Sequence, residues 1–465
     1  MVSVDADLET TTKNTGTKDE GSTAQFVTVA NDIITPVASR TRMPRVVVIG
    51  GGFAGINVAK SLAKSPVTVT LIDRRNHHLF APLLFQVATA QLSPANIAQP
   101  IRAITKGQKN LKVILGEVES IDSENRAISM ENGTSIPYDY LAVAVGATHS
   151  YFGHDEWEPV APGLKTLEDA ERIRRRILLA FERANVETDA EKQKALLTFI
   201  VIGGGPTGVE LAGAIGEIAH HTLAHEYDNI DPRQAKILLL EGLPRILPMF
   251  SEKLSVRATE ALKKFGVETR TNSLVTMIDE QGVDIGEERI ESTTVFWAAG
   301  VQVSALTRQL AGIATLDRAG RVPVERELHI AGHPEIFVIG DAGSVKTAEG
   351  KPLPGIAPVA MQEGQWAAAN IARRVKGEAY LPFNYVDKGS MATIGRNQAI
   401  AEIKGKQFGG FPAWLMWEMV HGAYLPGIRN RLMVFSQWLL NYFTYSRQAR
   451  LITGETDAER GKVAK

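Results

Sequence analysis

The alternation of apolar and polar positions predicts two similar units, each a short strand followed by a glycine-rich turn and a helix. In the first unit, the apolar run Val46–Ile49 predicts a strand buried on both faces. Apolar residues then recur at helical spacing as far as residue 63, and the run Val67–Ile72 predicts a second buried strand. The same order of strand, glycines and helix returns in residues 196–219, and a further apolar strand ends at Glu241. Two such units predict an α/β fold with two parallel-sheet domains.

Glycines occupy the turn of both units at the spacing Gly-x-Gly-x-x-Gly. This spacing permits a tight turn, close approach of a pyrophosphate to the backbone, and close packing of helix against strand. The helix that follows adds free N–H groups and the positive end of its dipole, which favour phosphates. We therefore predict two Rossmann-like dinucleotide-binding sites. The glycines are Gly50, Gly52 and Gly55 in the first unit, and Gly203, Gly205 and Gly208 in the second.

An acidic residue ends the second strand of each unit, where its carboxylate can accept hydrogen bonds from a ribose diol. These residues are Asp73 and Glu241. Glu241 favours NADH over NADPH, because a carboxylate repels a ribose 2′-phosphate. Arg245 lies close enough in sequence to weaken that preference.

Two histidines follow the second helix at a spacing that suits a metal ion. His221 and His225 stand at i, i+4. No third ligand is evident in the sequence, so a solvated helix end is the favoured interpretation and we expect no metal.

Composition and charge exclude several classes of protein. A formal net charge of -1 provides no basic field for nucleic acid. The absence of cysteine excludes disulfides, cysteine-ligated iron–sulfur clusters and thiol relays. Residues 1–43 are rich in polar residues and lack a hydrophobic period, which predicts a disordered tail. No run approaches about 18 apolar residues, so a spanning helix is not expected.

A third motif, His333–Gly343 (HPEIFVIGDAG), is an apolar strand that ends in Gly-Asp. It resembles the second FAD signature of the two-dinucleotide-binding flavoproteins, in which the acid, here Asp341, holds the ribityl chain of the flavin. The stretches Tyr138–Ala147 and Thr293–Val301 resemble the crossover strands of that family. The resemblance implies an FAD-binding domain split by an inserted NADH-binding domain. Their expected ranges are residues 44–165 and 310–385 for FAD, and residues 166–309 for NADH.

The lack of cysteine separates the chain from the disulfide reductases and sulfide:quinone reductases of this family, which need a redox cysteine pair beside the flavin. Four stretches instead resemble the type II, or alternative, NADH:quinone oxidoreductases. They are HHLFAPLLFQVATAQLSP after Asp73, GGGPTGVELAG, the GDAG turn, and DKGSMATIGRNQA at 387–399. The resemblance covers nearly everything after residue 44. It implies that NADH reduces FAD and that FAD reduces membrane quinone without proton pumping.

The resemblance also assigns roles to single residues. Glu210 is expected at the junction of nicotinamide and flavin, where it would handle protons, although a carboxylate in the first turn of a helix is also favoured by the dipole alone. Lys388 is either a surface lysine or a cation that stabilises reduced, anionic species near flavin and quinone. These two are the predicted catalytic residues. Phe53, Ala54 and Gly146 join the glycines and acids named above as expected FAD contacts.

One motif departs from the family. The quinone-side helix usually reads Ala-Gln-x-Ala-x-Gln, and this chain reads APVAMQ, so that Pro358 replaces the first glutamine. Proline suits the first turn of a helix, which leaves the helix able to form but removes one side-chain amide. Ala357, Gln362 and Met391 remain the expected quinone-side residues.

The C-terminal region, residues 386–465, is expected to associate with a membrane. Ile428, Leu432, Phe435, Leu439 and Tyr442 follow helical spacing, with Trp438 and Phe443 flanking that face. The stretch Phe411–Tyr424 is apolar on most sides, but it is too short to span and contains Glu418 and His421. Tryptophan, tyrosine and arginine favour the headgroup layer. Buried packing or a homodimer contact would explain the same residues.

Three functions remain open on this sequence. The leading one is an FAD-dependent NADH:quinone oxidoreductase that is peripheral to a membrane, at the cytoplasmic face of a bacterial inner membrane, and that forms a homodimer. A soluble NADH-dependent reductase of a ferredoxin or rubredoxin would not need the aromatic C-terminal region. A non-catalytic flavin redox sensor would not need an intact second glycine motif.

Overall fold

The computed structural model describes residues 42–347, 350–445, 447 and 449–453. The chain divides into Met1–Arg42 and Met43–Lys465, and the fold below is that of the second unit. The predicted tail, residues 1–43, lies outside the described residues except for its last two.

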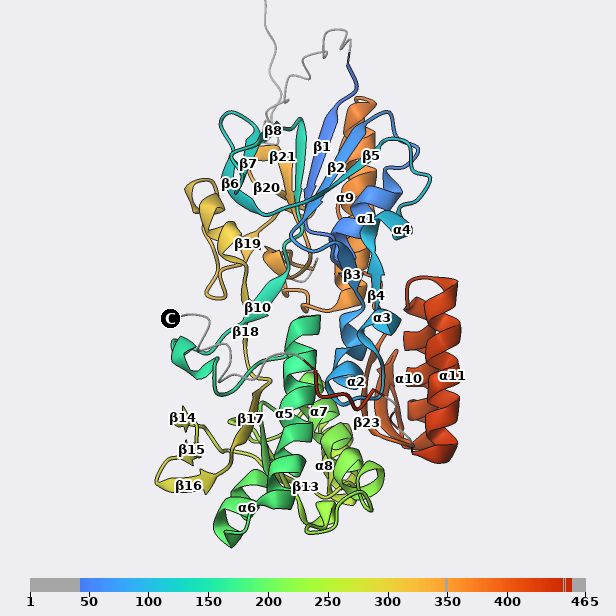
Figure 1. Cartoon of the computed structure of the whole chain (residues 1–465). Helices are drawn as coiled ribbons and strands as arrows, with labels where there is room; N and C mark the ends of the chain where they lie inside the picture. Colours follow the sequence, from blue (N-terminus) through green and yellow to red (C-terminus); the bar gives the residue numbers. More distant parts are fainter. Residues whose placement is uncertain (1–41, 348–349, 446, 448, 454–465) are drawn as a thin grey trace, which may run out of the picture. The chain divides into compact units, whose positions relative to one another are not determined.

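A six-stranded sheet in the order β20-β21-β9-β1-β2-β5 forms the centre of the first domain. The strands from β21 to β5 are parallel, and β20 pairs antiparallel with β21. β9 precedes the second domain along the chain and β21 follows it, yet the two strands pair. Segments from both sides of the second domain therefore build one sheet (Figure 1). The bounds are β1 Arg45–Ile49, β2 Thr68–Asp73, β5 Leu111–Leu115, β9 Tyr140–Val143, β20 His329–Ile330 and β21 His333–Val338.

Helices cover one face of this sheet and a small antiparallel sheet covers the other. Val46 and Val48 of β1 pack on the helical side, whereas Val47 and Ile49 pack on the other, as the alternation of a strand requires. The helices are α1 (Phe53–Ser61) and α9 (Ala357–Val375). The small sheet consists of β6 (Val118–Asp122), β7 (Ala127–Met130) and β8 (Ser135–Pro137).

The second domain repeats this arrangement around a parallel sheet in the order β13-β12-β11-β17. Val201 of β11 packs toward the helices, and Ile200 and Ile202 pack toward a second three-stranded antiparallel sheet. The strands are β11 Thr198–Ile202, β12 Lys236–Leu240, β13 Val267–Arg270, β14 Met277–Asp279, β15 Gly282–Ile285, β16 Glu288–Glu291 and β17 Thr294–Trp297. The helices are α5 Leu167–Val186, α6 Ala190–Leu196, α7 Pro206–Glu217 and α8 Glu252–Lys264.

Two short antiparallel strands connect the domains. They are β10 (Ala147–His149) and β18 (Val301–Val303). The sequence placed the crossovers slightly earlier, at Tyr138–Ala147 and Thr293–Val301. The structure differs, because the apolar parts of those stretches are β9 and β17, which lie inside the two parallel sheets.

A C-terminal module packs against the second domain. Its antiparallel sheet contains β23 (Ser390–Gly395), β24 (Gln398–Ile403) and β25 (Lys406–Gly409), and the helices α10 (Phe411–Tyr424) and α11 (Ile428–Thr444) follow. Figure 1 shows both helices in red beside the two domains. Among the described helices, none is both long enough and apolar enough to cross a membrane.

The remaining elements are short. The strands are β3 His77–Leu79, β4 Ala98–Pro100, β19 Val322–Pro323 and β22 Gly343–Ser344. The helices are α2 Leu84–Ala88, α3 Pro94–Ile97 and α4 Ile101–Ile104, and helical turns cover Ala81–Leu83, Asp155–Trp157, Ile218–Thr222, Pro232–Gln234, Ala305–Gly312 and Gly340–Ala342.

Helix α7 meets the C-terminal module at a glycine. A Cβ atom at Gly213 would lie 1.7 Å from the carbonyl oxygen of Ile394 on β23. Real Cβ atoms do not approach backbone oxygen so closely, so the contact requires glycine. The close approach fastens β23 to α7.

We predict that Gly213→Ala destabilises the holoenzyme, because the added methyl must push β23 away from α7. Overpacking of this kind costs about 1–3 kcal/mol. Thermal unfolding followed by flavin fluorescence measures the change. Gly312→Ala is the matched control, since nothing lies within 4 Å of a Cβ at that position. Equal melting temperatures for the two variants would contradict the prediction.

Candidate active site

The two glycine turns have nearly the same geometry. A Cβ at Gly55 would lie 1.8 Å from the carbonyl oxygen of Gly50, and a Cβ at Gly208 would lie 1.8 Å from that of Gly203. The first glycine of each turn has a positive φ, +101° at Gly50 and +111° at Gly203, which side-chain-bearing residues rarely adopt. Both turns therefore fold tightly only with glycine at these positions.

The acids that end the second strands hold these turns in place. Asp73 Oδ2 accepts a hydrogen bond from the amide of Gly51 at 2.5 Å. Glu241 Oε2 accepts one from the amide of Gly204 at 2.6 Å. The other oxygen of each carboxylate accepts from the amide two residues further on, at Arg75 and Leu243. The two predicted ribose-binding acids thus lie beside their glycine turns in equivalent positions.

The helix N-termini behind the turns are open to an anion. Gly52 and Gly205 cap α1 and α7, neither helix has an acidic residue in its first turn, and no side chain caps either end. Nothing lies within 4 Å of a Cβ built at either cap. This free space and the unpaired N–H groups fit the pyrophosphates of two dinucleotides.

A cavity of about 210 Å³ lies between β10, β18, the helical turn Gly340–Ala342 and α9. A Cβ built at Gly340 would lie 3.5 Å from that of Ala54, next to the first turn. Asp341, Gly340 and Ala360 line the cavity, and so do Lys165 and Glu363. Glu363 Oε2 accepts a hydrogen bond from the amide of Gly340 at 2.6 Å, and burial raises its pKa to about 8. The cavity has the polar groups and the position that a flavin needs. The sequence reasoning missed Glu363 and Lys165, because neither belongs to the glycine or Gly-Asp motifs.

The open backbone at Gly146 lies where the first domain passes into β10. It has a φ of +67°, and nothing lies within 4 Å of a Cβ there. Ala54 and Gly55 are buried in α1, whereas Phe53 is half-buried and its ring contacts His78. These predicted FAD contacts surround one turn, and their contact with FAD itself stays a prediction.

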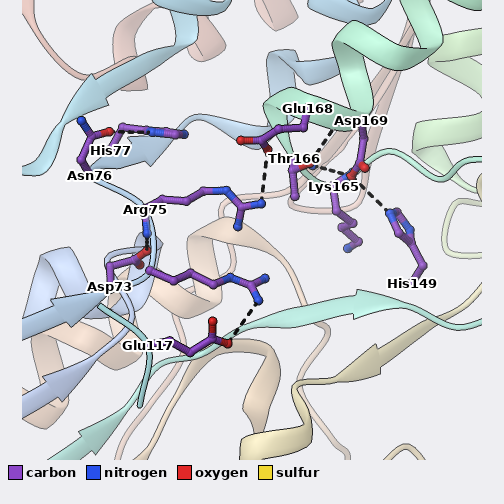
Figure 2. A network of polar contacts seen from close by, with 11 residues as sticks. Asp73, Arg75, Asn76, His77, Glu117, His149, Lys165, Thr166, Glu168 and Asp169 are labelled. Carbon is purple, nitrogen blue, oxygen red and sulfur yellow. Dashed lines mark hydrogen bonds and ion pairs between the residues drawn. The ribbon is translucent and has the colours of Figure 1, made fainter. Parts of the chain in front are cut away.

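A chain of polar contacts joins the first domain to the start of α5, as Figure 2 shows. Arg75, whose amide bonds Asp73, also donates from Nη2 to Glu168 Oε2 at 3.2 Å. Glu168 lies in the first turn of α5. Oδ2 of the next residue, Asp169, is 3.4 Å from Nε2 of His149. The ribose-side acid is therefore coupled to the domain connection. No sequence motif marked this network.

Glu210 does not lie in the first turn of its helix, and that part of the sequence argument was wrong. It is the fifth residue of α7, and the first turn holds no acid. Its Oε1 accepts from the amide of Thr393 on β23 at 3.4 Å. Burial, rather than the helix dipole, dominates its electrostatics and raises its pKa to about 8. Glu210 is thus a proton-holding carboxyl at neutral pH.

Lys388 lies on the loop before β23, and Gln362 of α9 contacts that loop. Lys388 Nζ donates to the hydroxyl of Tyr424, at the end of α10, at 3.0 Å. The amide of Gln362 both donates to the carbonyl of Val386 and accepts from its N–H, at 3.1 and 3.0 Å. Gln362 therefore holds the loop that presents Lys388. Met391, half-buried on β23, follows a few residues later.

The departure at Pro358 is accommodated. α9 begins at Ala357, and the proline occupies its first turn, where a missing N–H costs no hydrogen bond. The helix forms as predicted.

The two histidines do not assemble a metal site in the described part of the chain. No group of three or more potential metal ligands occurs among the residues that the structure describes. The ring of His221 stacks on Tyr445, with 4.7 Å between centroids. His225 is exposed beyond the helical turn Ile218–Thr222.

Comparison with known proteins places this geometry in a family. Residues 44–364 match the family described as pyridine nucleotide-disulphide oxidoreductase, and residues 388–448 match the NDH2 C-terminal domain. The type II NADH:quinone oxidoreductase NdhA of Mycobacterium tuberculosis is 43% identical over 88% of this chain and 90% of that protein. The Ndh protein of the same organism is 42% identical over 92% and 94%.

The chain belongs to the type II NADH:quinone oxidoreductase family. The fold agrees with a structure of NDH2 from Plasmodium falciparum in complex with NADH, at a TM-score of 0.80 and 21% identity, covering 89% of this chain and all of that one. The sulfide:quinone oxidoreductase of Aquifex aeolicus shares the fold at a TM-score of 0.67 and 20% identity, covering 86% and 95%. The predicted family, fold class, enzyme class and cofactors, FAD and NADH, are confirmed.

We predict that Glu210→Gln raises the stability of the holoenzyme relative to wild type as pH increases. The folded protein favours the protonated form of Glu210, because its pKa is about 8 there and about 4.5 in the unfolded chain. The free energy of unfolding that this preference contributes is therefore lost as pH rises from about 4.5 to about 8. Glutamine cannot ionise and escapes that loss. The difference in melting temperature between variant and wild type should grow by a few °C between pH 5 and pH 9.

The control is Glu280→Gln, which changes an exposed carboxylate. A difference for Glu210→Gln that is the same at both pH values would show that Glu210 ionises freely in the folded protein.

Proposed function

We propose that this chain oxidises NADH and passes two electrons, through FAD, to a membrane quinone without pumping protons. Family membership and the absence of cysteine support this function, because electrons have no thiol relay to enter after the flavin. FAD, when bound, supplies the hydride-accepting and electron-donating chemistry. The protein holds the two dinucleotides, orients them and controls protons.

The observation that carries the proposal is that one helix, α7, connects the second glycine turn to the C-terminal module. The N-terminus of α7 forms the open turn at Gly205, and its next turn carries Glu210. Glu210 in turn bonds Thr393 of β23, in the module that holds α10 and α11. The carboxyl of Glu210 therefore links the helix of the predicted NADH turn to the C-terminal module.

Each predicted site residue takes a role in this proposal. The turns at Gly50 and Gly203 hold the pyrophosphates of FAD and NADH, and Asp73 and Glu241 hold the riboses. Asp341 binds the ribityl chain. Lys388, placed by Gln362 and Tyr424, would stabilise negative charge on the reduced flavin or the quinone. Ala357 and Met391 would line the quinone side.

Arg245 supports a preference for NADH. Its guanidinium donates to the carbonyl oxygens of Phe250 and Pro248, at 2.7 and 2.8 Å. A side chain held this way is turned toward its own loop rather than toward a 2′-phosphate. Glu241 would then dominate the recognition of the ribose.

We predict that kcat/KM for NADH exceeds that for NADPH by about tenfold or more with a soluble quinone as acceptor, because Glu241 repels a 2′-phosphate. Steady-state kinetics on FAD-loaded protein measure the ratio. Glu241→Gln should narrow it without loss of bound FAD. An enzyme that reduces no quinone at all would refute the proposed function.

The exposed faces of α10 and α11 support association with a membrane surface. The exposed apolar residues are Phe411, Leu415, Met419 and Val420 on α10, and Ile428, Leu432, Met433, Leu439, Leu440 and Phe443 on α11. Arg429 and Arg431 are exposed beside them and favour anionic lipid. This arrangement fits a protein that rests on a membrane.

The structure divides the predicted apolar face of α11. Ile428, Leu432 and Leu439 are exposed, but Trp438 is buried and donates to Gln86 at 2.9 Å. Phe435 is half-buried against the core. One side of the helix is thus packed inward and the other remains available. The cytoplasmic membrane face and the homodimer stay predictions.

We predict that the double variant Ile428→Glu, Leu439→Glu no longer sediments with vesicles that contain anionic lipid, because it places two carboxylates on the apolar face. NADH oxidation with a soluble quinone should persist. The matched control is Leu274→Glu, which changes an exposed leucine of the second domain. Sedimentation of the double variant at wild-type levels would refute the proposal that these exposed helix faces bind the membrane.

A further inference from the structure

A small cavity lies beneath the C-terminal helices, enclosed by α7, β23, α10 and α11. Its volume is about 60 Å³. Glu210 and Glu217 enter it from one face of α7, two turns apart, and Glu418 enters from α10. Three carboxyl groups from two helices therefore line one cavity. Neither Glu217 nor Glu418 has a part in the function proposed above.

The three carboxyl groups differ in their partners. Glu217 is fully engaged, because Oε2 accepts from Arg447 Nη2 at 2.7 Å and Oε1 accepts from the amide of Arg396. Glu418 is only 8% exposed, yet its Oε2 has no hydrogen-bond partner among the described residues. A buried carboxyl oxygen without a partner is costly unless it is protonated or bonded to water.

Two further polar atoms on the cavity wall lack a partner among the described residues. They are Nδ2 of Asn441 and Nη1 of Arg396. A water molecule needs roughly 10–15 Å³ of such space and two to four polar partners. The cavity therefore has room, and the polar groups, for a short chain of water molecules between Glu418 and Glu210.

The outer end of the cavity reaches the protein surface. Thr222 and Tyr445 line it there, and Tyr445 is 40% exposed. Arg396 lies between the rings of Tyr442 and Tyr445, 4.4 and 3.8 Å from their centroids, and keeps this end of α11 in place. The inner end is Glu210, next to β23.

The reaction requires a proton from solvent. NADH releases a hydride, which carries two electrons and one proton, whereas a quinone must gain two electrons and two protons to become a quinol. The balanced reaction is NADH + H⁺ + quinone → NAD⁺ + quinol. One proton must therefore be taken up in each turnover.

We propose that this cavity conducts that proton, with Glu418 as a proton-holding residue that supplies Glu210 through water. The proposal rests on the function proposed above. Glu418 acts only through Glu210, to which it passes the proton. It does not touch the quinone. Glu217 is paired with Arg447, with Oε2 2.7 Å from Nη2.

The charged groups around Glu418 agree with this role. Glu217 and Glu210 of α7 face Glu418 across the cavity. His421 follows one turn later on its own helix. The other charged or titratable groups on the cavity wall are Arg396, Arg447, Tyr442 and Tyr445. Burial, followed by the charge of Glu217, raises the pKa of Glu418 to about 8. Burial lowers the pKa of His421 to about 4, so the imidazole stays neutral and does not compete. Glu418 can hold a proton up to about pH 8 and loses it above.

The test separates the two half-reactions in FAD-loaded, full-length protein. For Glu418→Gln, anaerobic stopped-flow reduction of the flavin by NADH should proceed at the wild-type rate. Reoxidation by a soluble quinone should slow about tenfold, and the step near pH 8 in its pH profile, to which Glu210 also contributes, should become smaller. Glu418→Asp should restore most of the rate, because it keeps a titratable group. Glu226→Gln is the control, an exposed carboxylate outside the cavity.

An independent readout requires no turnover. Infrared spectra recorded against pH should show a protonated carboxylic acid that titrates near pH 8 in wild type, and its band should weaken in Glu418→Gln. Wild-type reoxidation rates and pH profile in that variant, or an unchanged infrared band, would overturn the proton route. If wild-type protein itself reduces no quinone, the proposed function fails instead, so the two failures are distinguishable.

Discussion

Helix α7 is held by three approaches to backbone oxygen that leave no room for a side chain. Gly208 lies against the carbonyl of Gly203, Gly213 against that of Ile394, and Gly216 against that of Phe265. The first contact forms the predicted NADH turn, the second fastens the C-terminal module, and the third fixes the end of α8. Because these contacts are made by one rigid helix, Glu210 has a defined position relative to all of them. Every proposed step of the reaction depends on that placement.

The two nucleotide-binding turns are so alike that their geometry alone does not distinguish a resident cofactor from a passing substrate. The difference arises from what surrounds each turn. The first is extended by Asp341, by α9 and by a cavity that strands from both domains enclose. The second is followed by exposed loops around Leu243 and Met249. This contrast in enclosure supports the proposal that FAD stays bound at the first turn and that NADH exchanges at the second.

Local patterns were sufficient to predict the two turns, their acids and the family, because a glycine spacing and an apolar strand act over a few residues. The predicted residues Glu210 and Lys388 were found by resemblance, but their surroundings were not predictable. The pKa of Glu210 depends on burial beneath β23, which lies far along the chain. Likewise, the clamp of Gln362 on Val386 and the unpartnered oxygen of Glu418 exist only after packing. Helical periodicity also could not say that Trp438 turns inward while Leu439 stays outward.

The C-terminal helices have one further property that follows from their exposed thioethers. The chain contains no cysteine, so it has no thiol that an oxidant could modify. Met419 and Met433 are 56% and 44% exposed, on the faces proposed to meet lipid. Oxidation of either sulfur to a sulfoxide introduces a polar oxygen into an apolar surface. Oxidative damage would then detach the enzyme from its quinone supply while both nucleotide sites remain intact, and methionine sulfoxide reductases could reverse the loss.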